Sequence, residues 1–277
     1  MTIRYRQALI GFLFLTIGPA TYASDAYIVR FAAKGMANAC ANALWADDIL
    51  LYNRGTGPAT VRLLDVSNGT IRADTLRQVT LPAHRVFSVA GAQQFGVLWM
   101  PVGAPPIWVV HLDIPEGITI DSRDEVYYQT SCGSIPEIDR TPAGKVSLPV
   151  FRALVPAGEP QVKLGTDLGG RPGRLNVAVH NAADSAATAH IEVRNACDGA
   201  IVDARDVAIP AKTILQVGGF RTNGPDCTAT DAALWMRYTV ITVDQPSFSY
   251  VSNLTDELPP VDVVPPIGLA VSVNTEY

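Results

Sequence analysis

Apolar and polar side chains alternate with a period of two along much of this chain. The clearest stretch is residues 189–194 (AHIEVR), and residues 61–66 (VRLLDV) follow the same pattern less regularly. This alternation is typical of an antiparallel strand that has one buried and one exposed face. No helical stripe extends beyond two turns. The pattern therefore predicts an all-β chain.

Turn residues separate the predicted strands. Residues 54–58 (RGTGP) and 183–185 (ADS) supply backbone angles that a hairpin needs. Residues 81–83 (LPA) and 209–211 (IPA) are expected between strands, because proline cannot donate a hydrogen bond to a central ladder. Short strands spaced roughly every 8 to 12 residues indicate antiparallel β-sandwiches.

The chain contains an internal repeat. Residues 49–89 align without a gap to residues 177–217 at a constant offset of 128, with eight of 41 positions identical. The identical pairs include Asn53/Asn181, Thr60/Thr188, Pro82/Pro210 and Ala83/Ala211. A second correspondence matches residues 118–121 (ITID) to residues 241–244 (ITVD).

We interpret the repeat as two homologous domains, each with a core of its own. The predicted boundaries are 25–133 for the first domain and 146–257 for the second, with a Pro/Gly-containing linker at 134–145. A Pro-rich C-terminal tail covers residues 258–277.

The N-terminus has the pattern of a signal peptide. Arg4 and Arg6 precede the apolar run 8–17 (ALIGFLFLTI), and Thr21-Tyr22-Ala23 has small residues at the two positions that a signal peptidase reads. A run of this length is too short to cross a bilayer of about 30 Å. We expect residues 1–23 to be removed, the mature chain to begin at Ser24 without a transmembrane span, and the protein to be exported to the periplasm or the outside of the cell.

The order of these features resembles a known class of modules. The resemblance is carried by residues 45–53 (WADDILLYN), 59–61 (ATV), 81–83 (LPA) and 241–246 (ITVDQP), followed by Tyr250. This order is similar to tandem immunoglobulin-like β-sandwich modules of secreted bacterial proteins. The resemblance implies two tandem antiparallel immunoglobulin-like β-sandwiches after the cleaved signal peptide, and it implies little about function.

Four histidines limit the acid–base chemistry available. His190, Glu192 and Arg194 are expected on one strand face, which fits a metal or catalytic site or a solvated face. The solvated face is favoured, because a zinc site needs three converging ligands and no HExxH or HxH occurs. The chain also lacks GxSxG and the glycine-rich phosphate motifs, so we predict no catalytic residue, metal or cofactor.

Two tryptophans are candidate binding residues. Trp99 and Trp108 flank a Pro/Gly-rich segment, residues 101–106. Large rigid side chains near loops are enriched at binding surfaces, but tryptophan is also a usual core residue of β-sandwiches. Both interpretations stay open at this point.

The composition and net charge restrict the classes of molecule that we expect the chain to bind. The chain has 21 basic and 26 acidic residues and a formal net charge of −5, so it has no overall positive field for a nucleic acid. We expect a non-catalytic binding or surface-assembly protein with an unknown protein or glycan as ligand. The alternatives are an enzyme accessory module or a hydrolase with a loop-built site, or a chaperone-like strand donor with a basic anchor between its domains.

Export makes disulfides the expected state of the four cysteines. We predict the bridges Cys40–Cys132 and Cys197–Cys227, because only this connectivity keeps both pairs inside the repeat boundaries. Loss of either bridge would lower the free energy of unfolding by roughly 3 to 5 kcal/mol in the chain-entropy model. Peptide mapping without reduction tests the assignment, and a bridge across residues 134–145 or four free thiols would refute it.

Overall fold

The structure is a computed structural model. It describes residues 24–31, 44–68, 71, 77–88, 107–127, 144–147, 150–166, 173–196, 198–220 and 236–255. Every regular element in these ranges is a β-strand and every strand pair in the sheets is antiparallel, so the predicted all-β class is confirmed. Within the same ranges, no helix is long and apolar enough to cross a membrane.

The strands form four sheets, which we number in the order in which they pack. Sheet I has the order β5 (Val86–Ser88), β2 (Leu44–Asn53), β7 (Ile118–Tyr127), β8 (Gly144–Ser147). Sheet II has the order β4 (Gln78–Leu81), β3 (Ala59–Ser67), β6 (Ile107–Ile114), β1 (Ser24–Phe31), β9 (Val150–Phe151). Sheet III has the order β14 (Thr213–Val217), β11 (Gly173–Asn181), β16 (Ser247–Thr255). Sheet IV has the order β10 (Pro160–Thr166), β15 (Met236–Val243), β12 (Ala187–Asn195), β13 (Ile201–Ile209).

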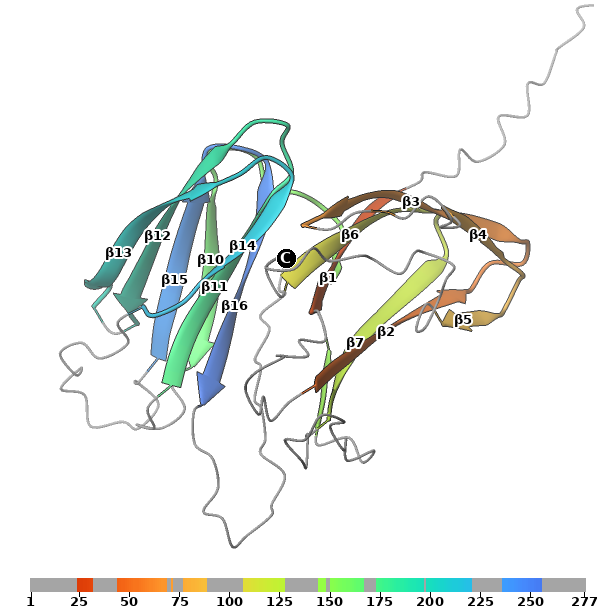
Figure 1. Cartoon of the computed structure of the whole chain (residues 1–277), viewed down its shortest axis with the longest axis horizontal. Coiled ribbons are helices and arrows are strands. Elements are labelled where there is room, and N and C mark those ends of the chain that lie inside the picture. Colours follow the sequence, from red (N-terminus) through yellow and green to blue (C-terminus); the bar gives the residue numbers. More distant parts are fainter. Residues whose placement is uncertain are drawn as a thin grey trace, which may run out of the picture.

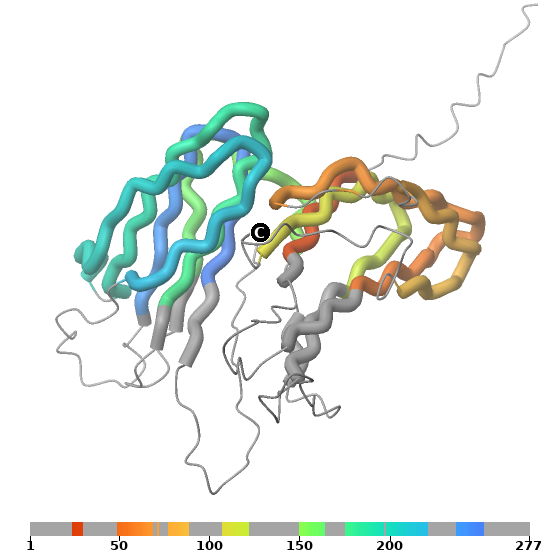
Figure 2. The backbone as a smooth tube through the Cα atoms, viewed as in Figure 1, coloured from red at the N-terminus to blue at the C-terminus, as the bar shows by residue number. Residues whose placement is uncertain are grey.

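Three apolar clusters show how the sheets stack. One cluster joins sheets I and II, and another joins sheets III and IV. A third cluster takes residues from β1, β6 and β9 on one side and from β11, β14 and β16 on the other, so it joins sheets II and III. Figure 1 shows the resulting arrangement, with β14 and β16 beside β6 and β1, and Figure 2 follows the backbone from one half of the molecule to the other.

The stack explains which strands alternate and which do not. The first four residues of β6, Ile107–Val110, are all buried, as are the seven residues 175–181 of β11. Both strands belong to the inner sheets, whose two faces are each covered by another sheet. In contrast, β12 lies in the outer sheet IV and keeps the buried–exposed alternation that the sequence predicts.

The contact between sheets II and III contains aromatic rings from both. The Phe248 ring stacks on Phe151 with centroids 4.1 Å apart and on His180 at 4.7 Å, and it lies 5.8 Å from Tyr27. Phe151 and Tyr27 come from sheet II, while Phe248 and His180 come from sheet III. The two halves therefore share a third core in addition to the one that each has, and this shared core was not expected from the sequence.

Hydrogen bonds reinforce this contact. Asn68 Nδ2 donates to the carbonyl oxygens of Ile107 (2.9 Å) and Ile214 (2.6 Å), while Asn68 Oδ1 accepts from Ile214 N at 3.3 Å. The side-chain amide of Asn68 thus makes two hydrogen bonds to the backbone of Ile214, as a residue of a neighbouring strand would. Asn68 has φ = 64°, a left-handed conformation that asparagine tolerates better than most residues. Ser67 Oγ and His180 Nε2 are hydrogen-bonded at 2.8 Å in the same contact.

The two halves share one strand order. The run β4-β3-β6-β1 in sheet II has the same connectivity as β13-β12-β15-β10 in sheet IV, and β5-β2-β7 in sheet I matches β14-β11-β16 in sheet III. The second sequence correspondence is wrong, because residues 118–121 lie on β7 whereas residues 241–243 lie on β15, the counterpart of β6. Residues 146–147 and 150–151, which the sequence assigns to the second domain, pair with β7 and β1 of the first half, respectively.

The repeated asparagine has the same role in both halves. Asn53 Nδ2 donates to the carbonyl oxygens of Gly57, Leu81 and Pro82, and its Oδ1 accepts from Gly55 N. Asn181, 128 positions later, makes the corresponding four bonds. Each side chain is buried and ties the hairpin turn to the Leu-Pro-Ala or Ile-Pro-Ala segment. This explains why the asparagine and the proline recur.

We predict that Asn181→Leu lowers the free energy of unfolding by about 2 to 4 kcal/mol, because it leaves buried carbonyl and amide groups without partners. Asn195→Leu is the matched control, since Asn195 is equally buried but neither of its side-chain polar atoms has a hydrogen-bond partner. The control is expected to stay within about 1 kcal/mol of the wild type or to be more stable. Urea unfolding measures both, and equal losses would contradict this account.

Candidate functional site

The most organised set of exposed polar side chains lies on the outer face of sheet IV. His190, Glu192 and Arg194 alternate along β12 with residues that point into the core between sheets III and IV. Asp206 lies directly opposite His190 on β13, so its side chain is on the same face. The structure therefore brings together the three residues that the sequence placed on one face, and adds Asp206.

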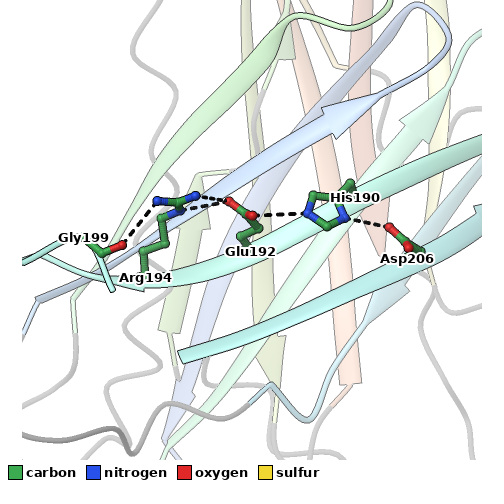
Figure 3. A network of polar contacts seen from close by, with 5 residues as sticks. All are labelled: His190, Glu192, Arg194, Gly199 and Asp206. Atoms are coloured by element: carbon green, nitrogen blue, oxygen red, sulfur yellow. Dashed lines mark hydrogen bonds and ion pairs between the residues drawn. The ribbon is translucent and has the colours of Figure 1, made fainter. Parts of the chain in front are cut away.

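These side chains form a continuous chain of contacts (Figure 3). His190 Nδ1 lies 2.6 Å from Asp206 Oδ1, and His190 Nε2 lies 3.2 Å from Glu192 Oε1. Arg194 donates to Glu192 Oε2 from Nε (2.9 Å) and Nη2 (2.7 Å). Arg194 Nη1 donates to the Gly199 carbonyl oxygen at 3.2 Å, which closes the chain at one end.

The contacts fix the charge of the network. Hydrogen bonds to Asp206 and Glu192 raise the pKa of His190, while the hydrogen bond from Arg194, followed by that from His190, lowers the pKa of Glu192. Each imidazole nitrogen of His190 faces a carboxylate oxygen, so both nitrogens are already engaged within the network.

Exposed apolar residues surround this network. Val162 on β10 and Val240 on β15 share the outer face with Glu192, because the three residues stand in one row of strand pairs. Val162 is one of the most exposed large apolar residues among those that the structure describes. The outer face of sheet IV thus combines apolar side chains with a network of charged and polar groups that contact one another. Binding surfaces of proteins have this mixed character.

The structure separates the two candidate tryptophans. Trp108 lies on β6 and is buried in the core between sheets I and II. This position fits the packing interpretation and leaves no exposed indole face for a ligand. Trp99 and the four cysteines, Cys40, Cys132, Cys197 and Cys227, lie outside the residues that the structure describes, as does the predicted signal peptide.

A pocket of about 450 Å³ opens at the junction of the two halves. It is lined by residues 150–156 with Glu159 and Pro160, which connect β9 to β10. Arg152 brings a cation to this pocket, and burial lowers the pKa of its guanidinium. Arg152 donates to the Ile118 carbonyl oxygen at 3.4 Å. No sequence pattern points to Arg152, because its position depends on how the connecting segment folds back.

The core between sheets III and IV has a polar edge that the sequence analysis also missed. Gln161 Nε2 donates to Ser247 Oγ at 2.9 Å, and Ser249 Oγ donates to Gln161 Oε1 at 2.6 Å, so β10 is bonded to β16. Lys163 is buried on the same strand, and burial lowers its pKa to about 8. The equivalent positions on β1 are the apolar Ala26 and Ile28, which shows that the two cores have diverged here.

Among the described residues, no group of three or more His, Cys, Asp and Glu side chains is placed to hold a metal ion. Comparison of the chain with protein-family models, with curated proteins and with solved structures gives no match. The functional argument therefore depends on the geometry of this chain alone.

We predict that His180 makes the fold sensitive to acid. Burial, together with the charges of His111 and Lys212, lowers the pKa of His180 to about 3. Below pH 6.5 the unfolded chain binds a proton here that the folded chain does not bind. The free energy of unfolding therefore falls as the pH is lowered from 6.5 toward 3, by up to about 1.4 kcal/mol for each pH unit.

Urea unfolding between pH 7 and pH 4 measures this dependence. His180→Gln, which keeps a hydrogen-bonding group near Ser67, is expected to have a shallower slope than the wild type. His84→Gln is the control, since His84 is exposed in a turn, and should keep the wild-type slope. Equal slopes for wild type and His180→Gln would show that His180 contributes no acid sensitivity.

Proposed function

We propose that this chain is an exported, non-catalytic protein that binds a protein or glycan, or assembles on a surface, in the periplasm or outside the cell. The observation that carries the proposal is the outer face of sheet IV. Its charged groups are satisfied among themselves, its histidine has no free nitrogen, and exposed apolar side chains adjoin it. Such a face can recognise a partner, and both nitrogens of its imidazole are already engaged by carboxylates.

The proposal includes two tandem immunoglobulin-like β-sandwiches. It is supported by the strand order that the two halves share and by the equivalent bonds of Asn53 and Asn181. Sheets I and II would form the first sandwich, and sheets III and IV the second. In this architecture, recognition is a property of the sheet faces and of the loops at the sandwich ends.

Export is supported by the signal-peptide pattern of residues 1–23, and the first described strand, β1, is compatible with it. This strand begins at Ser24 and pairs from that residue onward with Ile114 and the preceding residues of β6. Cleavage after Ala23 would therefore leave every described strand complete. The expected disulfides belong to the same proposal, because an exported chain meets an oxidising environment.

The junction pocket favours a second candidate function, a chaperone-like protein that pairs with a strand of its client. That function requires a cation between the domains to anchor a client carboxylate, and Arg152 meets this requirement. In the part of the chain that the structure describes, β9 pairs only with Tyr27 and Ile28 of β1, so the rest of this edge of sheet II has no described partner strand. An extended peptide could add to the remainder of that edge.

Site-specific photocrosslinking in the native host tests these functions. A photoreactive amino acid at Ala204, which is exposed on sheet IV opposite Glu192 and outside the charged network, is expected to give an ultraviolet-dependent adduct. The same amino acid at His84, in an exposed turn, is the control and should give none. A third position, Ala153 in the junction pocket, reports on strand binding instead.

Mass spectrometry of the adducts identifies the partner. An adduct at Ala204 alone supports binding or assembly through sheet IV, whereas an adduct at Ala153 alone supports the second candidate. No adduct at either position, or equal adducts at Ala204 and His84, would contradict the proposed function.

A further inference from the structure

The two outer sheets of the stack have the same strand orders as the two sheets that meet at its centre. Sheets II and III meet through the faces that they turn away from their own cores. Sheet IV corresponds to sheet II in strand order, and sheet I corresponds to sheet III. The outer face of sheet IV is therefore the counterpart of a face that already binds a sheet. The outer face of sheet I is likewise the counterpart of the face that sheet III uses to bind it.

Strand register identifies the equivalent residues on sheet I. His180 stands opposite Ile214 on one neighbouring strand and opposite Phe248 on the other. Tyr52 stands in the same way opposite Val86 and Thr119. Tyr52 and Val86 therefore occupy the positions of two residues that are buried between sheets II and III. In sheet I these side chains are 37% and 62% exposed.

The same comparison applies to sheet IV. Tyr27, which is buried against sheet III, stands opposite His111 on β6. Val162 stands opposite Val240 on β15, at the equivalent position of sheet IV, and is 58% exposed. The large apolar residues that are exposed in the described part of the chain are Tyr52, Leu64, Val86, Val162 and Ile201. Three of these five occupy positions whose counterparts are covered by a sheet.

We propose that the outer face of sheet IV of one chain binds the outer face of sheet I of a second copy. This inference rests on the proposed function and specifies its partner. The contact repeats the one between sheets II and III. Its two surfaces differ, so each bound chain offers a free face to the next, and assembly proceeds head to tail.

The internal contact also indicates which side chains would meet. Ser67, which bonds to His180, stands opposite Val109 on β6, and Arg194 stands at the equivalent position opposite Tyr238 on β15. Because Tyr52 is the counterpart of His180, the guanidinium of Arg194 is expected to contact the ring of Tyr52 in the next chain. A cation over an aromatic ring is a favourable contact at such a site.

The contact between chains is weaker than the contact within one chain. Phe248 and Tyr250 contribute apolar surface to the internal contact, whereas Thr119 and Asp121 occupy their positions in sheet I. Less apolar area is removed from water, so the free energy of association is smaller. The assembly is therefore expected to be reversible and to depend on protein concentration.

Sedimentation velocity of the purified exported chain tests the proposal. For the wild type, the weight-average mass is expected to rise with concentration beyond that of a dimer. Val162→Arg on sheet IV and Val86→Arg on sheet I are each expected to weaken association at least about tenfold, because the arginine charge would be buried without a partner. Leu64→Arg is the matched control, since Leu64 is 43% exposed and lies on neither outer sheet.

A mixture of the two variants is the decisive measurement. The Val162→Arg chain keeps an intact sheet I and the Val86→Arg chain keeps an intact sheet IV, so together they are expected to form heterodimers and nothing larger. If Val86→Arg alone still dimerises, sheet IV pairs with itself and the proposal is wrong. A wild type that stays monomeric up to about 1 mM would also overturn it. Tyr52→Arg replaces Val86→Arg if thermal melting shows that the latter is unfolded.

These outcomes separate the inference from the proposed function. An adduct at Ala204 that contains another protein or a glycan, together with a monomeric purified chain, would retain the binding function and reject self-assembly. The absence of an adduct at Ala204 would reject the binding function, whatever the sedimentation result.

Discussion

The burial of both faces of sheets II and III is the constraint on which the rest of the structure depends. Phe248 contacts rings of both halves, and Asn68 continues the hydrogen bonding of one half onto Ile214 of the other. Among the described residues, the occupied inner faces leave the outer faces of sheets I and IV and the junction near Arg152 for other molecules. Both candidate functions use surfaces from this set.

The sequence predicted the features that depend on local pattern. Alternation at residues 189–194 predicted β12, and the same alternation correctly placed His190, Glu192 and Arg194 on one face. It could not predict Asp206 as their partner, because that depends on the pairing of β13 with β12. The role of Trp108 stayed open for a similar reason, since a tryptophan near a loop has the same sequence context in a core and on a surface.

The contact between the halves was missed because its residues carry no special pattern. A continuous apolar run such as Ile107–Val110 is consistent with any strand that is buried on two sides, and the sequence does not say what covers it. His180 looked like one of several strand histidines, yet it is buried beside Ser67 in this contact. Asn53 and Asn181 are identical residues at matching positions of the repeat, which the sequence shows. Their structural role depends on the fold, because each connects a hairpin turn to a distant proline-containing segment.

The position of Asn68 has a consequence for how the protein can be produced. Asn68-Gly69-Thr70 is an acceptor sequence for N-linked glycosylation in hosts that carry out this modification. The sugar would be attached to Nδ2, the atom that donates to the carbonyl oxygens of Ile107 and Ile214 between the two halves. A glycan at this nitrogen is incompatible with the contact and would hold sheets II and III apart. Glycosylation of Asn68 in a eukaryotic secretory host is therefore expected to weaken the contact between the two halves.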